Sequence, residues 1–81
     1  MKIVWDEPKR LANIDKHGID FEQMGRFDWI AARVTPARSG RLQAVGRLDG
    51  QVVSVIFRAL GTEAISIISV RTANTEERSL L

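Results

Sequence analysis

The 81-residue sequence contains no cysteine, no tyrosine and a single histidine, His17. Without cysteine, the chain forms no disulfide, no cysteine-based zinc site and no thiol nucleophile. One histidine excludes the nucleases that work with a pair of catalytic histidines. No glycine-rich phosphate loop precedes a helix, and the acidic residues do not have the spacing of a metal-ligand cluster. We therefore predict neither a cofactor nor a metal site.

Long apolar runs are also absent, since none approaches the roughly 18 residues of a membrane-spanning helix. At the N-terminus, the carboxylate of Asp6 follows too soon for the apolar core of a secretory signal. The sequence predicts one domain over residues 1–81, located in the cytoplasm and without membrane contact. So short a chain buries a modest fraction of its surface, which leaves room for a partner to contribute stability.

Positive charge is concentrated in one segment, although the formal net charge is only +2. Residues 33–48 carry four arginines and no acidic residue, whereas residues 1–32 and 49–81 each hold one more acidic than basic residue. The four are Arg33, Arg38, Arg41 and Arg47. One basic segment in a balanced chain indicates a polyanion or an acidic partner. The alternative is a solvated arginine-rich hairpin.

Start and stop signals predict a first helix over residues 8–16. Asp6 precedes it as a potential N-cap, a proline lies in its first turn, and Gly18 suits its left-handed end. Leu11 and Ile14 are expected on its buried face.

A capping box predicts a second helix over residues 21–27. Asp20 is followed three residues later by Gln23, so each side chain can bind the backbone N–H of the other. Phe21 and Met24 are expected to face inward.

Strands are expected over residues 3–5, 33–38, 41–48, 51–58 and 63–71. The Asp49-Gly50 pair predicts a tight hairpin, because Asp-Gly between alternating apolar runs favours a two-residue type I′ turn. The register of this hairpin places Arg41 opposite Arg58. Like charges across a strand pair are unfavourable, so we expect an anionic group to neutralise them.

The strand over residues 63–71 is apolar on both faces and is expected inside the sheet. If Leu60-Gly61 also forms a two-residue turn, Glu63 pairs with Arg58. Asn74 then begins a short C-terminal helix. The predicted order β-α-α-β-β-β-β-α describes an α+β domain with an antiparallel sheet.

Two blocks of short motifs lie near the ends of the chain. The first contains Trp5-Asp6, Asn13, Lys16-His17-Gly18 and Phe21-Glu22. The second contains Ile67-Ile68-Ser69, Arg71, Ala73 and Glu77-Arg78. In this order they resemble the BrnT family, the toxin half of a bacterial type II toxin–antitoxin pair. Val70 replaces the usual alanine, and the chain ends at Leu81 without the tyrosine of many relatives, so no role of that tyrosine is transferred.

This resemblance implies a RelE-like fold with two N-terminal helices and a short C-terminal helix. It implies a ribonuclease toxin that inhibits translation and growth until a cognate BrnA-like antitoxin neutralises it in a hetero-oligomeric complex. It also implies that the complex represses its own operon, with operator DNA contacted mainly by the antitoxin.

The residues themselves fit RNA cleavage without a metal ion. The ribose 2′-OH attacks the adjacent phosphorus, so the protein has to position the RNA and stabilise the charge of the phosphorane. Arginine suits this task because its fork binds phosphate oxygens bidentately and stays charged. Arg71, at the end of the last strand, is the first catalytic candidate, and Arg78 in the last helix is the second. The residues expected to bind the RNA substrate are Arg41, Arg47 and Arg58.

Three further residues are catalytic candidates, each with a structural alternative. Histidine suits proton transfer near neutral pH, but His17 also precedes a helix-ending glycine, where it stabilises the helix dipole. Lys9 either binds phosphate or is a solvated charge. Glu77 either assists the neighbouring arginine or caps the last helix. Trp5 and Trp29 either stack on bases or belong to the core.

Two other functions fit the sequence. A basic sheet face also suits a non-catalytic binding module for nucleic acid or an acidic protein segment. The small core suits a structural partner whose sheet is completed by another chain. Metal-independent cleavage of RNA distinguishes the ribonuclease from both.

Overall fold

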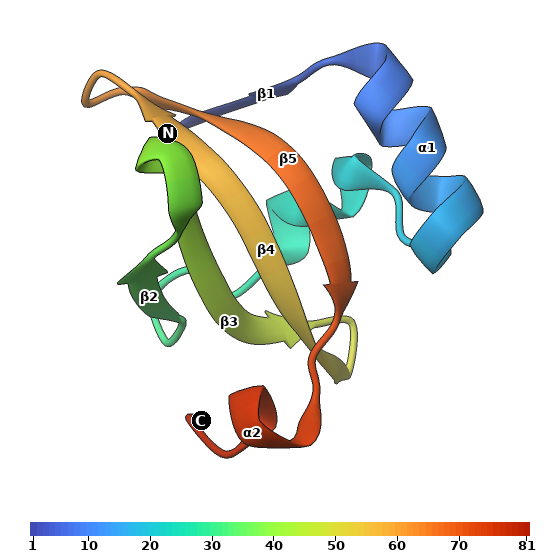
Figure 1. Ribbon diagram of the computed structural model, residues 1–81, viewed down its shortest axis with the longest axis vertical. Coiled ribbons are helices and arrows are strands. Elements are labelled where there is room, and N and C mark those ends of the chain that lie inside the picture. The colour runs from blue at the N-terminus through green and yellow to red at the C-terminus, as the bar shows by residue number, and fades with distance from the viewer.

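The computed structural model describes residues 1–81 as one five-stranded sheet with helical segments around it (Figure 1). In chain order the elements are β1 (Lys2–Trp5), α1 (Glu7–His17), the 3-10 helix η1 (Phe21–Arg26), β2 (Arg33–Pro36), the 3-10 helix η2 (Arg38–Gly40), β3 (Leu42–Leu48), β4 (Gln51–Leu60), β5 (Ala64–Thr72) and α2 (Thr75–Arg78). None of the helices is long and apolar enough to cross a membrane.

The strands lie in the order β1-β5-β4-β3-β2. The α+β class is confirmed, but the prediction of a wholly antiparallel sheet is wrong. β1 runs parallel to β5, and only the other three pairs are antiparallel. A parallel pair needs a long connection. Here the connection is residues 6–63, which contain α1, η1 and the other three strands.

One face of the sheet carries the core, and the opposite face, which we call the open face, is exposed only in part, since Val45 and Ser54 are buried on it. η1 packs behind the sheet in the view of Figure 1 and completes the buried face. The core consists of Ile19, Phe21, Met24, Phe27, Ala44, Leu48, Val53, Val55, Phe57, Ile65, Ile67 and Val70. Gly46 lies against the same core, and a Cβ atom there would be 2.6 Å from the Cζ atom of Phe27. Glycine is therefore needed for the ring to approach the strand.

The β3–β4 hairpin has the predicted register. Leu42 faces Phe57, and the pairing continues without interruption to the turn. Asp49 and Gly50 have φ angles of 47° and 82°, as a type I′ turn requires at both central positions. The register therefore follows from the turn.

The first predicted helix is confirmed by α1, which ends before Gly18 with a left-handed φ of 71°. Asp6 lies at the N-cap position, but its side chain makes no capping hydrogen bond. The predicted buried face is wrong, because Leu11 is 54% exposed and Ile14 is 37% exposed. α1 lies beside β5 rather than over the core (Figure 1), so Asn13 is its one buried residue.

The second predicted helix is the 3-10 helix η1, so the prediction of two N-terminal helices is only partly confirmed. Asp20 and Gln23 form the predicted capping box. Phe21 and Met24 are fully buried, as expected. The backbone becomes extended at Phe27, with φ −67° and ψ 136°. The helical segment between Asp20 and Phe27 therefore has six residues, which is two turns of a 3-10 helix.

The side chain of Asn13 closes the edge of β5 beyond the reach of β1. The pairing of β1 with β5 ends at Ile67. Further along β5, Asn13 accepts a hydrogen bond from the N–H of Val70 at 3.0 Å and donates to its C=O at 2.9 Å. The same amide donates to the C=O of Ile19 at 2.9 Å. Asn13 thus replaces a missing neighbouring strand and fixes α1 against the sheet.

The turn between β4 and β5 differs from the expected one. Residues 61–63 form the connection, and Arg58 lies opposite Ser66. The prediction that Glu63 pairs with Arg58 is therefore wrong, because the turn begins one residue later than the predicted Leu60-Gly61 and has three residues instead of two.

A β-bulge interrupts β5, with Ile68 as the extra residue between the paired positions Ile67 and Ser69. Side chains alternate along a regular strand, so residues three apart point to opposite faces. The extra residue corrects this by one step. Ser66 and Ser69 consequently share the open face of the sheet.

We expect Asn13→Ala to lower the free energy of unfolding by on the order of 2–3 kcal/mol, because the N–H and C=O of Val70 lose buried partners. Urea denaturation measures the change. Leu11→Ala on the same helix is the matched control and should cost less than about 1 kcal/mol, because most of that side chain is exposed. Equal losses in the two variants would contradict the role of Asn13.

Candidate functional site

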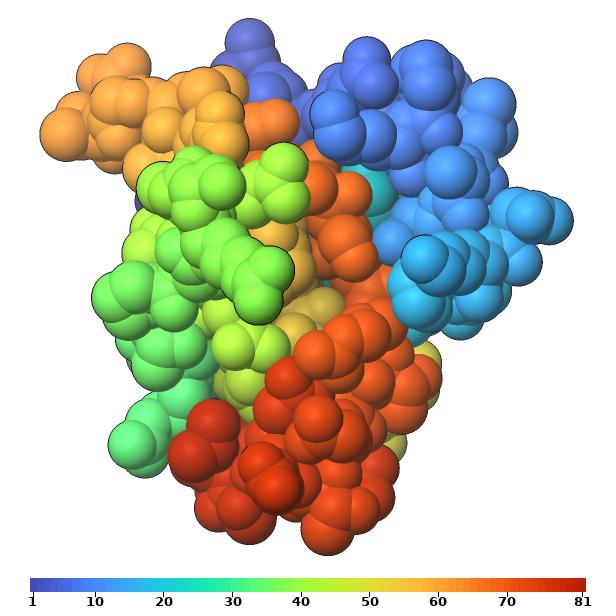
Figure 2. Space-filling model, in the orientation of Figure 1, coloured from blue at the N-terminus to red at the C-terminus, as the bar shows by residue number.

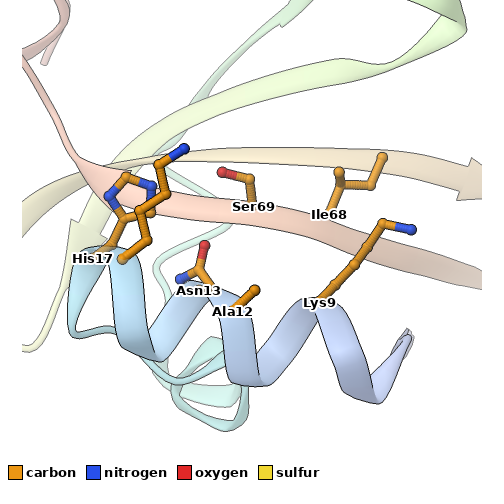
Figure 3. A pocket seen from close by; sticks show the side chains of 7 residues that line it. Lys9, Ala12, Asn13, His17, Ile68 and Ser69 are labelled. Atoms are coloured by element: carbon orange, nitrogen blue, oxygen red, sulfur yellow. The ribbon is translucent and has the colours of Figure 1, made fainter.

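Two adjoining hollows lie on the open face, where the surface dips between α1 and the sheet (Figure 2). The first is lined by Lys9, Ala12, Asn13, Lys16, His17, Ile68 and Ser69 (Figure 3). The second is lined by Lys9, Arg41, Arg58, Leu60, Ser66 and Ile68. Because Lys9 and Ile68 line both, the hollows form one channel, which we call the α1–β5 groove. Its lining includes lysine and arginine side chains but no acidic one.

Helical periodicity builds the α1 side of the groove. Lys9, Asn13 and His17 are four residues apart, so their side chains lie on one face of the helix. In Figure 3 these side chains extend from α1 toward β5. Asn13, in the middle, is the buried anchor on the strand, so it holds both flanking residues at the groove.

The sheet side of the groove comes from β4, β5 and the residue before β3. Arg41 and Arg58 line the same hollow, as expected from the hairpin register. Nη2 of Arg58 donates to the C=O of Ser39 at 3.1 Å, which orients the guanidinium without neutralising it. Ser66 and Ser69 add hydroxyl groups to the two hollows. Clustered cations without an acidic neighbour create a positive potential that attracts an anion.

Arg71 has a different environment, because it is paired with Glu77. Its Nη1 and Nη2 donate to the two carboxylate oxygens of Glu77, both at 2.8 Å. Gln43 donates to the same carboxylate at 2.8 Å and also to the Ser54 hydroxyl. The N–H of Asn74 completes the set at 3.0 Å, in the predicted cap of α2. The Arg71 guanidinium lowers the pKa of Glu77 to about 2, and the carboxylate raises the pKa of Arg71.

Two other predicted site residues lie outside the α1–β5 groove. Nη1 of Arg78 donates to the C=O of Ala73 at 3.0 Å, so its guanidinium folds back on its own segment. Arg47 lines a third hollow, together with Ala31, Gly46 and Leu81. The candidates thus form three sets: the groove residues, the Arg71–Glu77 pair and these two separate arginines. No three His, Asp or Glu side chains lie close enough together to hold a metal ion.

Several groove residues were not singled out from the sequence as site residues. Lys16 is seven residues from Lys9, and this helical spacing was a usable signal for it. Asn13 is centred on the same face, but a buried amide bound to a strand edge has no sequence signature. Ser66 and Ser69 share a face only because of the bulge, which the sequence does not indicate.

Acidification should weaken the wild-type fold more than the fold of Glu77→Gln. The folded-state pKa of Glu77 is depressed from 4.5 to about 2, so its contribution is complete above 4.5 and is lost as the pH falls toward 2. With Arg71 39% exposed and solvent screening the pair, we expect a difference of roughly 1–2 kcal/mol. Urea unfolding at neutral pH and at about pH 3 measures it.

Glu76→Gln, at the exposed neighbouring position, is the matched control and should behave as the wild type. Asp49 also has a pKa lowered to about 2, through its hydrogen bond from Arg26. This residue is present in every variant, so its effect cancels in the comparison. Identical acid sensitivity of Glu77→Gln and the wild type would contradict a stabilising Arg71–Glu77 pair.

Comparison with known proteins identifies the family of this chain. Residues 5–77 match the family model described as the ribonuclease toxin BrnT of a type II toxin–antitoxin system. The chain is also similar to the Brucella abortus ribonuclease toxin BrnT, whose crystal structure was determined at 1.1 Å. The TM-score is 0.81 and the sequence identity 46%, over 93% of this chain and 99% of that one. Curated protein sequences give no significant match. The family model spans most of the chain and the structural match nearly all of it, so this chain belongs to the BrnT family of ribonuclease toxins of type II toxin–antitoxin systems.

Proposed function

We propose that the chain is a metal-independent endoribonuclease that inhibits translation and growth by cutting RNA. The observation that carries this proposal is the α1–β5 groove, where lysine and arginine side chains converge without an acidic neighbour. Such a groove attracts the RNA backbone. Since no cluster of metal-ligating side chains accompanies it, its cations are the groups at hand to stabilise a phosphorane.

The proposed reaction uses the substrate's own nucleophile. The 2′-oxygen forms a bond to phosphorus, the bond from phosphorus to the 5′-oxygen breaks, and a proton passes from the first oxygen to the second. The products are a 2′,3′-cyclic phosphate and a 5′-hydroxyl. Lys9, Arg41 and Arg58 are assigned to the phosphate oxygens, and His17, which lines the same groove, is assigned to proton transfer.

Arg71 and Glu77 remain catalytic candidates, provided that RNA binding opens the ion pair between them. A phosphate that binds both arms of the Arg71 guanidinium has to displace the Glu77 carboxylate, which now occupies them. The released carboxylate then becomes available as a base. Arg78 has to leave the C=O of Ala73 in the same way. Arg47 is proposed to contact RNA that extends beyond the groove.

Membership of a type II toxin family implies an antitoxin partner and an RNA substrate. We propose that the antitoxin is BrnA-like, that it forms a hetero-oligomer with this chain and that it supplies the contacts to operator DNA. A RelE-like relationship of the fold is likewise a proposal, supported by the α+β layout and the short last helix.

Purified protein is expected to cut RNA at the same rate with magnesium and with EDTA, and to leave cyclic phosphate ends, because no step uses a metal. Arg58→Gln should lower the rate by on the order of 100-fold, as for the loss of one donor to a developing oxyanion. Gel analysis of a labelled RNA and of its 2′-deoxy analogue measures both. The analogue should remain intact.

Arg26→Gln is the matched control for this assay. It removes one positive charge on η1, where Arg26 pairs with Asp49 and lines neither hollow. Cleavage that stops in EDTA, or a 2′-deoxy RNA that is cut, would overturn the proposed mechanism. Tight RNA binding without cleavage would support a binding module instead.

A test of His17 separates its two proposed roles. If it transfers a proton, His17→Ala should lower the rate by on the order of 100-fold and remove the pH dependence near neutrality. If it only stabilises the end of α1, the rate per folded molecule stays the same and the free energy of unfolding falls. Rate–pH profiles and urea unfolding of the same preparations distinguish these results.

A further inference from the structure

All five phenylalanine and tryptophan rings of the chain belong to the buried side of the sheet. Trp5 lies edge-on to Phe21, with ring centroids 6.2 Å apart. Trp29 lies edge-on to Phe27 at 4.7 Å and to Phe57 at 5.4 Å. The expectation that the tryptophans belong to the core therefore agrees with their contacts, and the imidazole of His17 is the one ring that lines the α1–β5 groove.

The polar groups of the groove are almost all hydrogen-bond donors. Lysine and arginine offer only N–H groups. The single amide, Asn13, already uses both N–H groups on the C=O groups of Val70 and Ile19, and its oxygen already accepts from the N–H of Val70. The remaining acceptors are His17 in its neutral form and the hydroxyls of Ser66 and Ser69. A donor-rich lining complements phosphate oxygens, which only accept, whereas the Watson–Crick edge of every base also presents N–H donors.

We infer that the groove binds RNA through its sugar–phosphate backbone, with one phosphate in each of the two adjoining hollows and no stacked base, so that base identity contributes little to affinity. This inference rests on the proposed function, since it takes the groove as the RNA site. It goes beyond it by naming which part of the RNA is recognised.

Known modes of RNA recognition support the inference. Sequence-specific binding of RNA usually stacks splayed bases on aromatic rings or guanidinium planes and reads their edges with donors and acceptors. Here the phenylalanine and tryptophan rings pack on the core side of the sheet, so the groove offers only the His17 ring and the guanidinium planes of Arg41 and Arg58 for stacking. Lys9 lines both hollows, so it is placed to contact two successive phosphates.

The test uses uncleavable 2′-O-methyl oligomers of equal length: oligo-U, oligo-A and a chain of abasic 2′-O-methyl ribose phosphates. Their affinities, measured by fluorescence anisotropy, should agree within about fivefold, since one stacked base alone changes affinity by about that factor or more. An abasic chain that binds more than about fivefold more weakly than both base-bearing oligomers, or a larger preference between the two, would overturn the inference.

Salt dependence tests the number of phosphates. Two contacts on a single strand give a slope of log K against log salt of about −1.4, or about a sevenfold loss of affinity between 50 and 200 mM salt. Arg58→Gln should reduce the slope by up to about 0.7, because it removes one of the two guanidinium groups, Arg41 and Arg58, that line the second hollow. Arg26→Gln, with the same net charge, should leave it unchanged. A steeper wild-type slope, or equal slopes in the two variants, would contradict two phosphates in this groove.

The outcomes separate this inference from the proposed function. If none of the oligomers binds, the α1–β5 groove is not an RNA site, and both the proposed function of the groove and the inference fail. Cleavage of RNA by the wild type, combined with strong discrimination against the abasic chain, would leave the ribonuclease proposal in place and reject backbone recognition alone.

Discussion

The contact between the Asn13 side chain and the backbone of Val70 is the interaction on which the rest of this structure depends. β1 is too short to cover the full edge of β5, and an open strand edge leaves backbone N–H and C=O groups without partners. One amide supplies both missing partners. Because this amide is in the middle of α1, it also sets which helix face meets the strand, and Lys9 and His17 are on that face.

The two cation environments of the open face differ in charge, because only the Arg71 environment contains a carboxylate. Arg71 is bound by Glu77, which is itself held by Gln43 and the N-cap of α2. Arg58 is bound only by a carbonyl group. A guanidinium with a neutral partner keeps its charge available to a ligand, whereas an ion-paired guanidinium has to exchange one anion for another. This difference favours the α1–β5 groove over the Arg71 region as the first contact of RNA.

Local chemistry determined which features were predictable from the sequence. The Asp49-Gly50 turn fixes φ angles at two residues, so the hairpin register and the neighbourhood of Arg41 and Arg58 followed directly. The left-handed end of α1 at Gly18 and the Asp20–Gln23 capping box of η1 were also local, whereas the predicted capping hydrogen bond of Asp6 is not formed. The buried face of α1 was wrongly predicted because helix periodicity was read as core packing, while the actual contact is a polar bond at a strand edge. The bulge at Ile68 depends on pairing between β4 and β5, and the Arg71–Glu77 pair depends on how the chain turns from β5 into α2; no short motif encodes either.

Unpaired cations in the groove have a consequence for the folded state itself. Positive side chains gathered around Lys9 repel one another, and solvent in the open hollows only partly screens this repulsion. An anion that binds the folded chain removes the repulsion and shifts the equilibrium toward folding. Without a ligand, α1 is held to β5 against the repulsion of its own lysines. The buried hydrogen bonds of Asn13 oppose this repulsion. The free energy that holds α1 against β5 therefore depends both on these hydrogen bonds and on the charge of the groove.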